Sequence, residues 1–135
     1  MIIGFTGTQD GMTVWQEKEV ERFLVELNCS VLVHGSCVGA DFHADQIADR
    51  LEIKRKIRPC NIKEKRARCE LRGAEQIAEP IAPLVRNHKI VDDCALLIAC
   101  PKGMSEELRS GTWATIRYAR KIGKEVIIVW PEDSE

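Results

Sequence analysis

Residues 95–130, ALLIACPKGMSEELRSGTWATIRYARKIGKEVIIVW, contain a complete strand–helix–strand unit. Residues 95–99 are a continuous apolar run that Pro101 stops, and residues 126–130 are a second such run, so both are predicted as strands. The segment between them is predicted to be helical from about Gly111, because apolar residues recur three or four apart: Trp113, Ile116, Ala119 and Ile122. Strands that are apolar throughout are typical of a parallel sheet covered on both faces.

The same order of strand, turn and helix occurs twice earlier in the chain. Residues 2–5 form a short apolar run that breaks at Thr6, and Thr13 with Gln16 has the spacing of a capping box that begins a helix. Residues 31–34 form another run. A glycine-bracketed turn follows it, and then a helix with the inner-face residues Ala40, Ala44, Ile47, Ala48 and Leu51.

The middle of the chain predicts less regular structure. Residues 56–58 are predicted as a short third strand that ends at Pro59, and residues 84–93 as a short helix. Strands that alternate with helices predict an α/β fold. We therefore expect a three-layer Rossmann-like sandwich with a mostly parallel sheet of about five strands, formed by a single domain over residues 1–135.

Composition limits the class of protein. Hydrophobic residues make up 44% and charged residues 30% of the chain, and no apolar run approaches the roughly 20 residues of a membrane-spanning helix. The N-terminus lacks the features of a signal peptide, so we expect a cytoplasmic protein without a membrane partner. The six cysteines form no CxxC pair and the three histidines no metal-binding spacing, so neither a metal site nor a cofactor is predicted.

Charge is distributed unevenly along the chain. Residues 50–72 contain ten basic and three acidic residues, a net charge of +7, so the remainder carries −8 of the overall −1. Such a segment either attracts phosphates or nucleic acid or forms a solvated helix face or loop. It contains no aromatic residue on which a base could stack, which disfavours single-strand binding.

Three turns at predicted strand or helix ends combine glycine with polar side chains. They contain Thr6, Gly7 and Thr8; His34, Gly35, Ser36 and Gly39; and Ser110, Gly111 and Thr112. In an open parallel sheet these ends meet at one edge, where helix N-termini present unpaired N–H groups. Glycine lets a ligand approach the main chain, and hydroxyl groups bond phosphate or ribose. Their joint occurrence favours a phosphate- or nucleotide-binding cleft, although no turn is a standard signature.

Four charged or polar residues near these turns are further candidates. Arg86 can grip a phosphate bidentately, and Asn87 can contact a base or sugar. Asp41 begins the second helix, where a carboxylate either favours the helix dipole or binds a ribose hydroxyl. His34 is either an acid–base group or a hydrogen-bonded structural histidine.

Four stretches together resemble a known superfamily. GFTGTQDGMT, VHGSCVGADFHA, VRNHKIVDDCALLIACP and SGTWATIRYARKIGKEVIIVWP, in this order, are similar to the small Rossmann-like SLOG superfamily and to its YspA-related branch. The resemblance covers most of the chain except residues 50–80. This superfamily includes the phosphoribohydrolases called LOG and the DNA-processing protein DprA.

The resemblance implies roles for particular residues. Arg86 looks like the arginine near the phosphate in LOG-like sites, and Gly111 with Thr112 looks like the phosphate-holding turn. The catalytic glutamate of the LOG motif PGGxGTxxE is replaced here by Thr115, which has no carboxylate. An enzyme would therefore need a substitute carboxylate, for which the candidates are Asp41, Glu106 and Glu107.

The leading functional prediction is the binding of a nucleotide or nucleotide-derived small molecule, as a sensor or a sponge. The alternative is a hydrolase that cleaves the N-glycosidic bond of a nucleoside 5′-monophosphate, and a third is DNA binding in the manner of DprA. The resemblance also implies a homo-oligomer.

Overall fold

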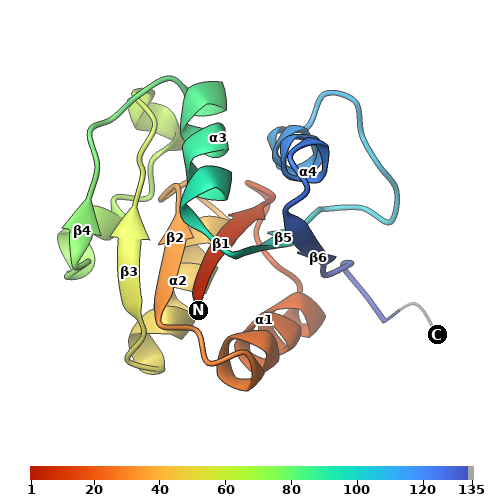
Figure 1. The fold of residues 1–135 in the computed structure, drawn as a ribbon, viewed down its shortest axis with the longest axis horizontal. Coiled ribbons are helices and arrows are strands. Elements are labelled where there is room, and N and C mark those ends of the chain that lie inside the picture. Colours follow the sequence, from red (N-terminus) through yellow and green to blue (C-terminus); the bar gives the residue numbers. More distant parts are fainter. Residues whose placement is uncertain (134–135) are drawn as a thin grey trace.

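The computed structural model describes residues 1–133; residues 134–135 of the predicted domain lie outside the described part. Figure 1 shows the order of the elements. They are β1 (Ile2–Gly7), α1 (Val14–Glu26), β2 (Val31–His34), α2 (Ala40–Arg50), β3 (Lys54–Ile57), the 3₁₀ helices η1 (Lys63–Lys65) and η2 (Cys69–Arg72), β4 (Gln76–Ile77), α3 (Pro83–Asp93), β5 (Leu96–Cys100), α4 (Gly111–Lys121) and β6 (Glu125–Ile128).

The strands form one parallel sheet in the order β4-β3-β2-β1-β5-β6. The predicted α/β fold is confirmed, but the sheet has six strands and not about five. The additional strand is β4, which pairs Gln76 and Ile77 with Lys56 and Ile57 of β3. Both β4 residues are exposed, so the strand has no apolar run that sequence analysis could detect. The predicted strand over residues 56–58 lies earlier, at Lys54–Ile57.

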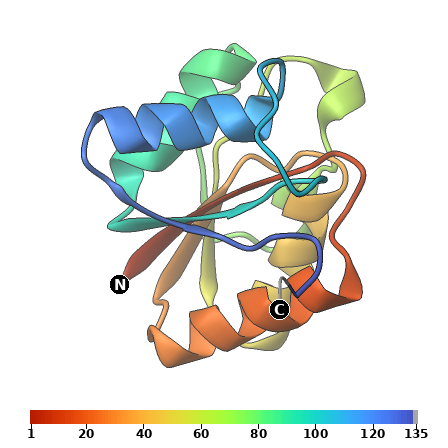
Figure 2. The same cartoon turned by 90° about the vertical axis from the view of Figure 1, so that its right-hand side faces the viewer.

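Two layers of helices cover the sheet. Figure 2 shows α3 and α4 above the sheet and α1 and α2 below it. The lower core is packed around Phe5, Leu24, Leu32 and Ile98, all of which are buried. The upper face has two smaller apolar clusters, around Leu97 and around Trp113. The predicted three-layer arrangement is therefore present.

Side-chain caps begin two of the helices as their sequences indicate. The Gln16 main-chain N–H donates to Thr13 Oγ1 over 3.1 Å, and the Thr13 N–H donates to Gln16 Oε1 over 3.0 Å, which is the predicted capping box. Gln16 is itself buried, and its amide group also donates to the carbonyls of Pro101 and Val129. This one side chain therefore links the start of α1 to the segments that follow β5 and β6.

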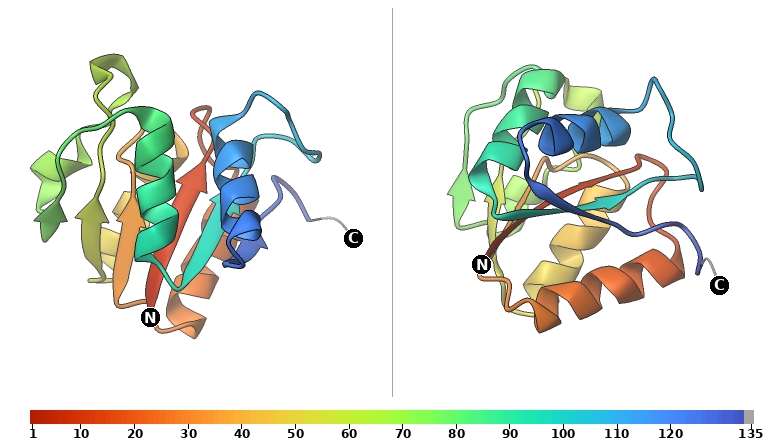
Figure 3. Two further views of the ribbon diagram at one scale, coloured as in Figure 1. Left: turned by 45° about the horizontal axis from the view of Figure 1, so that its top comes forward. Right: turned by 45° about the vertical axis from the view of Figure 1, so that its right-hand side comes forward.

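The carboxyl ends of all strands lie at one edge of the sheet, as Figure 3 shows. The strand order reverses between β1 and β5, where the chain runs outward in both directions. Such a reversal leaves a crevice outside the strand ends, because the connecting helices leave to opposite faces. The loop of residues 101–110 between β5 and α4 arches out beyond this edge. In residues 1–133, no helix has both the length and the apolar character needed to cross a bilayer.

Candidate functional site

A cleft of about 520 Å³ opens at this edge of the sheet. Ten of the residues predicted from sequence line it: Thr6, Gly7, Thr8, Asp41, Arg86, Asn87, Glu107, Ser110, Gly111 and Thr112. The prediction that the strand-end turns come together therefore agrees with the geometry. Its walls also include Pro83 and Leu84 at the start of α3, so the first turns of α2, α3 and α4 all face the same space.

Five predicted residues lie outside the cleft lining. His34, Gly35 and Ser36 are buried behind it, and Gly39 begins α2 with a positive φ of 89°. Glu106 is exposed and forms an ion pair with Arg117 over 2.8 Å. These residues shape or flank the cleft, but none of them belongs to its lining.

The N-terminus of α4 is the most open part of the wall. Ser110 Oγ accepts a hydrogen bond from the Trp113 N–H over 3.3 Å, so this hydroxyl caps the helix. A Cβ added at Gly111 would meet no heavy atom within 4 Å, which leaves open space beside the first helical N–H groups. These groups carry the positive end of the helix dipole. Together with the Thr112 hydroxyl, they form a site suited to an anion.

Arg86 of α3 supplies a buried positive charge, with 5% of its surface exposed. Its Nη1 donates to the Gly35 carbonyl over 3.0 Å and to the Arg58 carbonyl over 3.3 Å, and its Nε donates to Asn87 Oδ1 over 2.8 Å. Its Nη2 contacts Cys37 Sγ at 3.2 Å. Four of the five N–H groups are thus used to hold the guanidinium in place, and one N–H is free among the described residues. Arg86 therefore offers a fixed positive charge to a ligand, and not the bidentate grip expected from sequence.

Arg86 also lacks a negative partner. Among residues 1–133, no carboxylate oxygen lies within the 4.0 Å of an ion pair from this guanidinium. A buried charge without a counter-charge is costly, and the neutral oxygens that bond this guanidinium do not cancel its charge, so Arg86 can attract an anion into the cleft.

Asp41 is the corresponding negative group, with 4% of its surface exposed. The main-chain N–H groups of Gly35 and Cys37 both donate to its Oδ2, each over 3.1 Å. Asp41 therefore holds the turn after β2 in place and at the same time lines the cleft.

Three further cations line the cleft that sequence analysis did not assign to it: Lys65, Lys102 and Arg109. Lys102 lies 3.8 Å from Glu107, in an exposed ion pair. Lys65 comes from the basic segment, which docks on the turn after β2: the Val38 N–H donates to the Lys65 carbonyl, and the Ala67 N–H to the Ser36 carbonyl. Main-chain contacts of this kind have no sequence signature, which is why Lys65 was missed.

Ser36 joins the same segment to the turn. Its hydroxyl donates to Glu70 Oε2 over 3.1 Å and accepts from the Cys69 N–H over 2.8 Å. Ser36 is fully buried with φ of 53°, a left-handed conformation that is uncommon for serine. Its hydroxyl is therefore committed to bonds within the protein.

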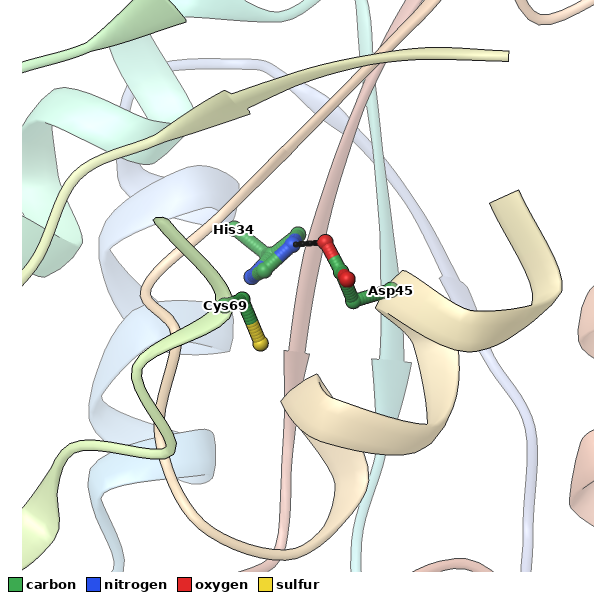
Figure 4. Close-up of side chains that lie close together, drawn as sticks. All are labelled: His34, Asp45 and Cys69. Atoms are coloured by element: carbon green, nitrogen blue, oxygen red, sulfur yellow. Dashed lines mark hydrogen bonds and ion pairs between the residues drawn. The ribbon is translucent and has the colours of Figure 1, made fainter. Parts of the chain in front are cut away.

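Figure 4 shows a buried cluster of His34, Asp45 and Cys69 behind the cleft. Their ligand atoms lie within 4.8 Å of one another, as in a metal site. However, the Ser36 N–H donates to His34 Nδ1, so the ring proton lies on Nε2, which donates to Asp45 Oδ1 over 2.8 Å. Burial raises the pKa of the Cys69 thiol to about 12.

Asp45 is occupied on its other side as well. Arg55 Nη1 donates to Asp45 Oδ2 over 2.9 Å. Burial raises the pKa of this carboxyl, but the hydrogen bond from His34 and the charge of Arg55 outweigh it, so the pKa is lowered. The ring nitrogens and the carboxylate oxygens are therefore engaged in hydrogen bonds within the protein, and the cluster supports the turn after β2 from behind.

Ion pairs hold more than half of the cations of the basic segment. Six of its ten cations pair with carboxylates: Arg50, Arg55, Lys56, Arg58, Arg66 and Arg72. Several partners lie elsewhere in the chain, such as Asp93, which accepts from both Lys56 and Arg58. The charge asymmetry of the sequence is therefore largely an ion-pair network, and neither a free basic patch nor a simple solvated face.

Neither Thr115 nor Cys37 supplies a reactive group to the cleft. Thr115, at the position of the LOG glutamate, is buried, and its hydroxyl donates to the Gly111 carbonyl over 2.8 Å. The Cys37 thiol lines the cleft, but burial raises its pKa to about 12, so it is not a reactive thiolate at neutral pH.

No protein-family model matches the chain, and no curated protein matches it. Solved structures do resemble it. The molybdenum cofactor binding protein from the phototrophic bacterium Rippkaea orientalis has a TM-score of 0.71 and 22% sequence identity, over 97% of this chain and 77% of that protein.

Two structures of DprA are also similar. The Streptococcus pneumoniae protein has a TM-score of 0.73 and 20% identity over 98% of this chain, which spans 50% of that protein. The Helicobacter pylori protein, described for its single-stranded DNA binding, has a TM-score of 0.72 and 20% identity over 100% of this chain and 67% of its own. At these identities the likeness concerns the fold, which is Rossmann-like in agreement with the sequence resemblance to DprA.

Proposed function

We propose that this protein binds a nucleotide or a nucleotide-derived small molecule in the cleft, with its phosphate at the N-terminus of α4. The observation that carries the proposal is the buried Arg86 guanidinium, which lines the cleft without a carboxylate partner among the described residues. The open space at Gly111, the Thr112 hydroxyl and the flexible cations Lys65 and Arg109 supply the remaining phosphate contacts.

Binding without turnover is favoured over hydrolysis. The position of the LOG glutamate holds Thr115, whose hydroxyl is bonded inside the helix. Of the substitute carboxylates, Glu106 does not line the cleft, and Glu107, which does, is partly exposed and paired with Lys102. Asp41 remains, but main-chain N–H groups bond its Oδ2 and hold it as a fixed acceptor, which suits positioning better than proton donation.

The proteins of similar fold bind two different classes of ligand. One is described as binding molybdenum cofactor, and the DprA of Helicobacter pylori as binding single-stranded DNA. The pairing of the cations in the basic segment disfavours a broad DNA surface here, because only Lys54, Lys63, Lys65 and Arg68 of this segment lack an ion pair among the described residues. Membership of the YspA-related branch and the homo-oligomer both stay predictions.

The proposal is tested by calorimetric titration of the wild-type chain with AMP, GMP, CMP and UMP, alongside an oligodeoxynucleotide. We expect at least one monophosphate to bind, without release of free base by chromatography. Gly111→Ala should weaken that binding by roughly 10-fold or more, because the added methyl group enters the phosphate site.

Gly103→Ala is the matched control, since a Cβ there also meets nothing within 4 Å but Gly103 does not line the cleft. It should leave the affinity unchanged. Binding of the oligodeoxynucleotide alone, or equal affinity in both glycine variants, would contradict the proposed site. Release of base that depends on Asp41 would instead favour the hydrolase.

A further inference from the structure

Asp41 and Arg86 are opposite charges buried in the same wall, yet they do not pair. They are 4% and 5% exposed, and both line the cleft. Buried charges ordinarily pair, because each one alone loses its hydration without compensation. Their separation therefore needs a structural cause.

The turn after β2 keeps the two groups apart. Gly35 donates its N–H to Asp41 Oδ2, and its carbonyl accepts from Arg86 Nη1. Cys37 likewise donates its N–H to Asp41, while its sulfur contacts Arg86 Nη2. One residue thus stands between carboxylate and guanidinium at both points, through main-chain atoms at Gly35 and through the N–H and the thiol at Cys37, so the charges are kept apart while the turn is intact.

The carboxylate of Asp41 is only half satisfied by the protein. Both main-chain donors reach Oδ2, and among residues 1–133 no donor forms a hydrogen bond with Oδ1. An ionised carboxylate oxygen only accepts hydrogen bonds. Oδ1 is not among the buried atoms without a partner, and Asp41 lines the cleft, so this oxygen is an acceptor that a donor on the ligand can reach.

We infer that Asp41 accepts a hydrogen bond from a ribose hydroxyl of the bound molecule, so that the cleft selects ribonucleotides over deoxyribonucleotides. This inference rests on the proposed function. Since one residue separates Arg86 from Asp41, the donor must lie within a few atoms of the anionic group. A hydroxyl of a phosphorylated pentose meets this requirement, whereas the amino group of a base lies at the far end of a nucleotide.

Selection against the deoxy sugar also follows from the energetics. A hydroxyl bonded to a carboxylate makes a charge-assisted hydrogen bond, and a ligand without it buries the oxygen unpaired. The loss of affinity is expected to be roughly 10- to 100-fold. The same contact distinguishes ribonucleotides from the deoxyribose backbone of DNA.

The test titrates the best-binding ribonucleoside monophosphate, together with its 2′-deoxy and 3′-deoxy analogues, into the wild type and Asp41→Asn. Asparagine keeps a carbonyl oxygen for the N–H groups of Gly35 and Cys37 but presents an NH₂ group to the cleft. We expect the 2′-deoxy analogue to bind the wild type roughly 10- to 100-fold more weakly, and this ratio to fall in the variant, whose neutral amide makes no charge-assisted hydrogen bond.

Equal affinities of the ribonucleotide and its 2′-deoxy analogue for the wild type would overturn the inference and leave the proposed function standing, whatever the 3′-deoxy analogue does. An unchanged ratio in Asp41→Asn would overturn it too, because another group would then hold the hydroxyl. If no ribonucleotide binds at all, the proposed function fails and the inference fails with it. If the variant does not fold, competition by ribose 5-phosphate and 2-deoxyribose 5-phosphate on the wild type decides, and equal competition refutes it.

Discussion

Asp41 and Asp45 lie one turn apart on α2, but only Asp45 has a positively charged partner among the described residues. Asp45 is completely buried and is bonded by His34 and by Arg55. Asp41 is almost as buried, but it receives only main-chain N–H groups on one oxygen, and no cation pairs with it among the described residues. Spacing by four residues gives both carboxylates the same helix face, so position along the helix does not explain the difference.

The difference lies in what each carboxylate faces. Asp45 faces β2, β3 and η2, where the protein supplies its own counter-charge, whereas Asp41 faces the cleft. Charges that serve the fold are compensated within it, and charges left uncompensated at a cleft are available to a ligand. The six paired cations of the basic segment follow the first rule, and Asp41 and Arg86 of the cleft follow the second.

The largest effect is expected when the same change is made at both aspartates. Asp45→Asn removes the buried counter-charge of Arg55 and leaves it only the exposed Asp49 at 3.5 Å, so it should lower the free energy of unfolding by about 3 kcal/mol. Asp41→Asn keeps its two hydrogen bonds and should cost less than about 1 kcal/mol. Urea unfolding measures the free energy of unfolding of both variants. Similar losses at both positions would show that the two carboxylates contribute equally to stability, against the proposed difference between them.

Gly35→Ala should break the turn that separates the charges. A Cβ at Gly35 would lie 2.7 Å from Cζ of Arg86 and closer still to Nη1, so the guanidinium must move. We expect a loss of about 1–3 kcal/mol in unfolding free energy, together with weaker nucleotide binding. Gly103→Ala again serves as the control. If the Gly35→Ala protein is destabilised but its affinity is unchanged, the position of Arg86 does not affect ligand binding.

Lowering the pH should reduce the free energy of unfolding through protonation of Asp45. Its pKa in the folded state is lowered from the ordinary value of 3.8, so its stabilisation is fully present above that value and is lost as the pH falls through the folded pKa. The free energy of unfolding should therefore fall between about pH 5 and pH 3, and less steeply in Asp45→Asn. Equal slopes for the two proteins would assign the acid sensitivity to other carboxyls, such as Asp93 and Glu70, whose pKa values are also lowered.

The smallest effect is expected for a pair of neighbouring lysines. Lys65 lines the cleft and Lys63 does not, and both are exposed in η1. Lys65→Ala should weaken nucleotide binding by about 2- to 5-fold, and Lys63→Ala should leave it unchanged, since exposed charge pairs contribute about 0.2–1 kcal/mol. Neither variant should alter thermal unfolding measurably. An equal loss in both would indicate general attraction by the basic segment.

Much of this architecture could be read from local sequence patterns. The capping box of Thr13 and Gln16 is present, and the apolar runs before Thr6, before Gly35 and before Pro101 are strands. The turns after β1 and before α4 do line one cleft, and Asp41 joins them from the start of α2, because parallel strands place their carboxyl ends at one edge.

Other features had no local signal. The two exposed residues of β4 lack an apolar pattern, and the docking of residues 63–72 on the turn after β2 rests largely on main-chain hydrogen bonds. Consequently Lys65 was not assigned to the cleft. The same docking also explains Ser36, a predicted ligand residue whose hydroxyl instead bonds Glu70 and Cys69.

The amino-acid sequence by itself determined the parallel α/β fold and the positions of its polar turns, because helix and strand periodicity and turn chemistry act over a few residues. Only the tertiary structure decided which charges are compensated. Arg58 finds Asp93 35 residues away, and Asp41 is kept from Arg86 by one turn of main chain. Ion pairing depends on distances of a few ångströms in space, and the order of residues along the chain does not contain those distances.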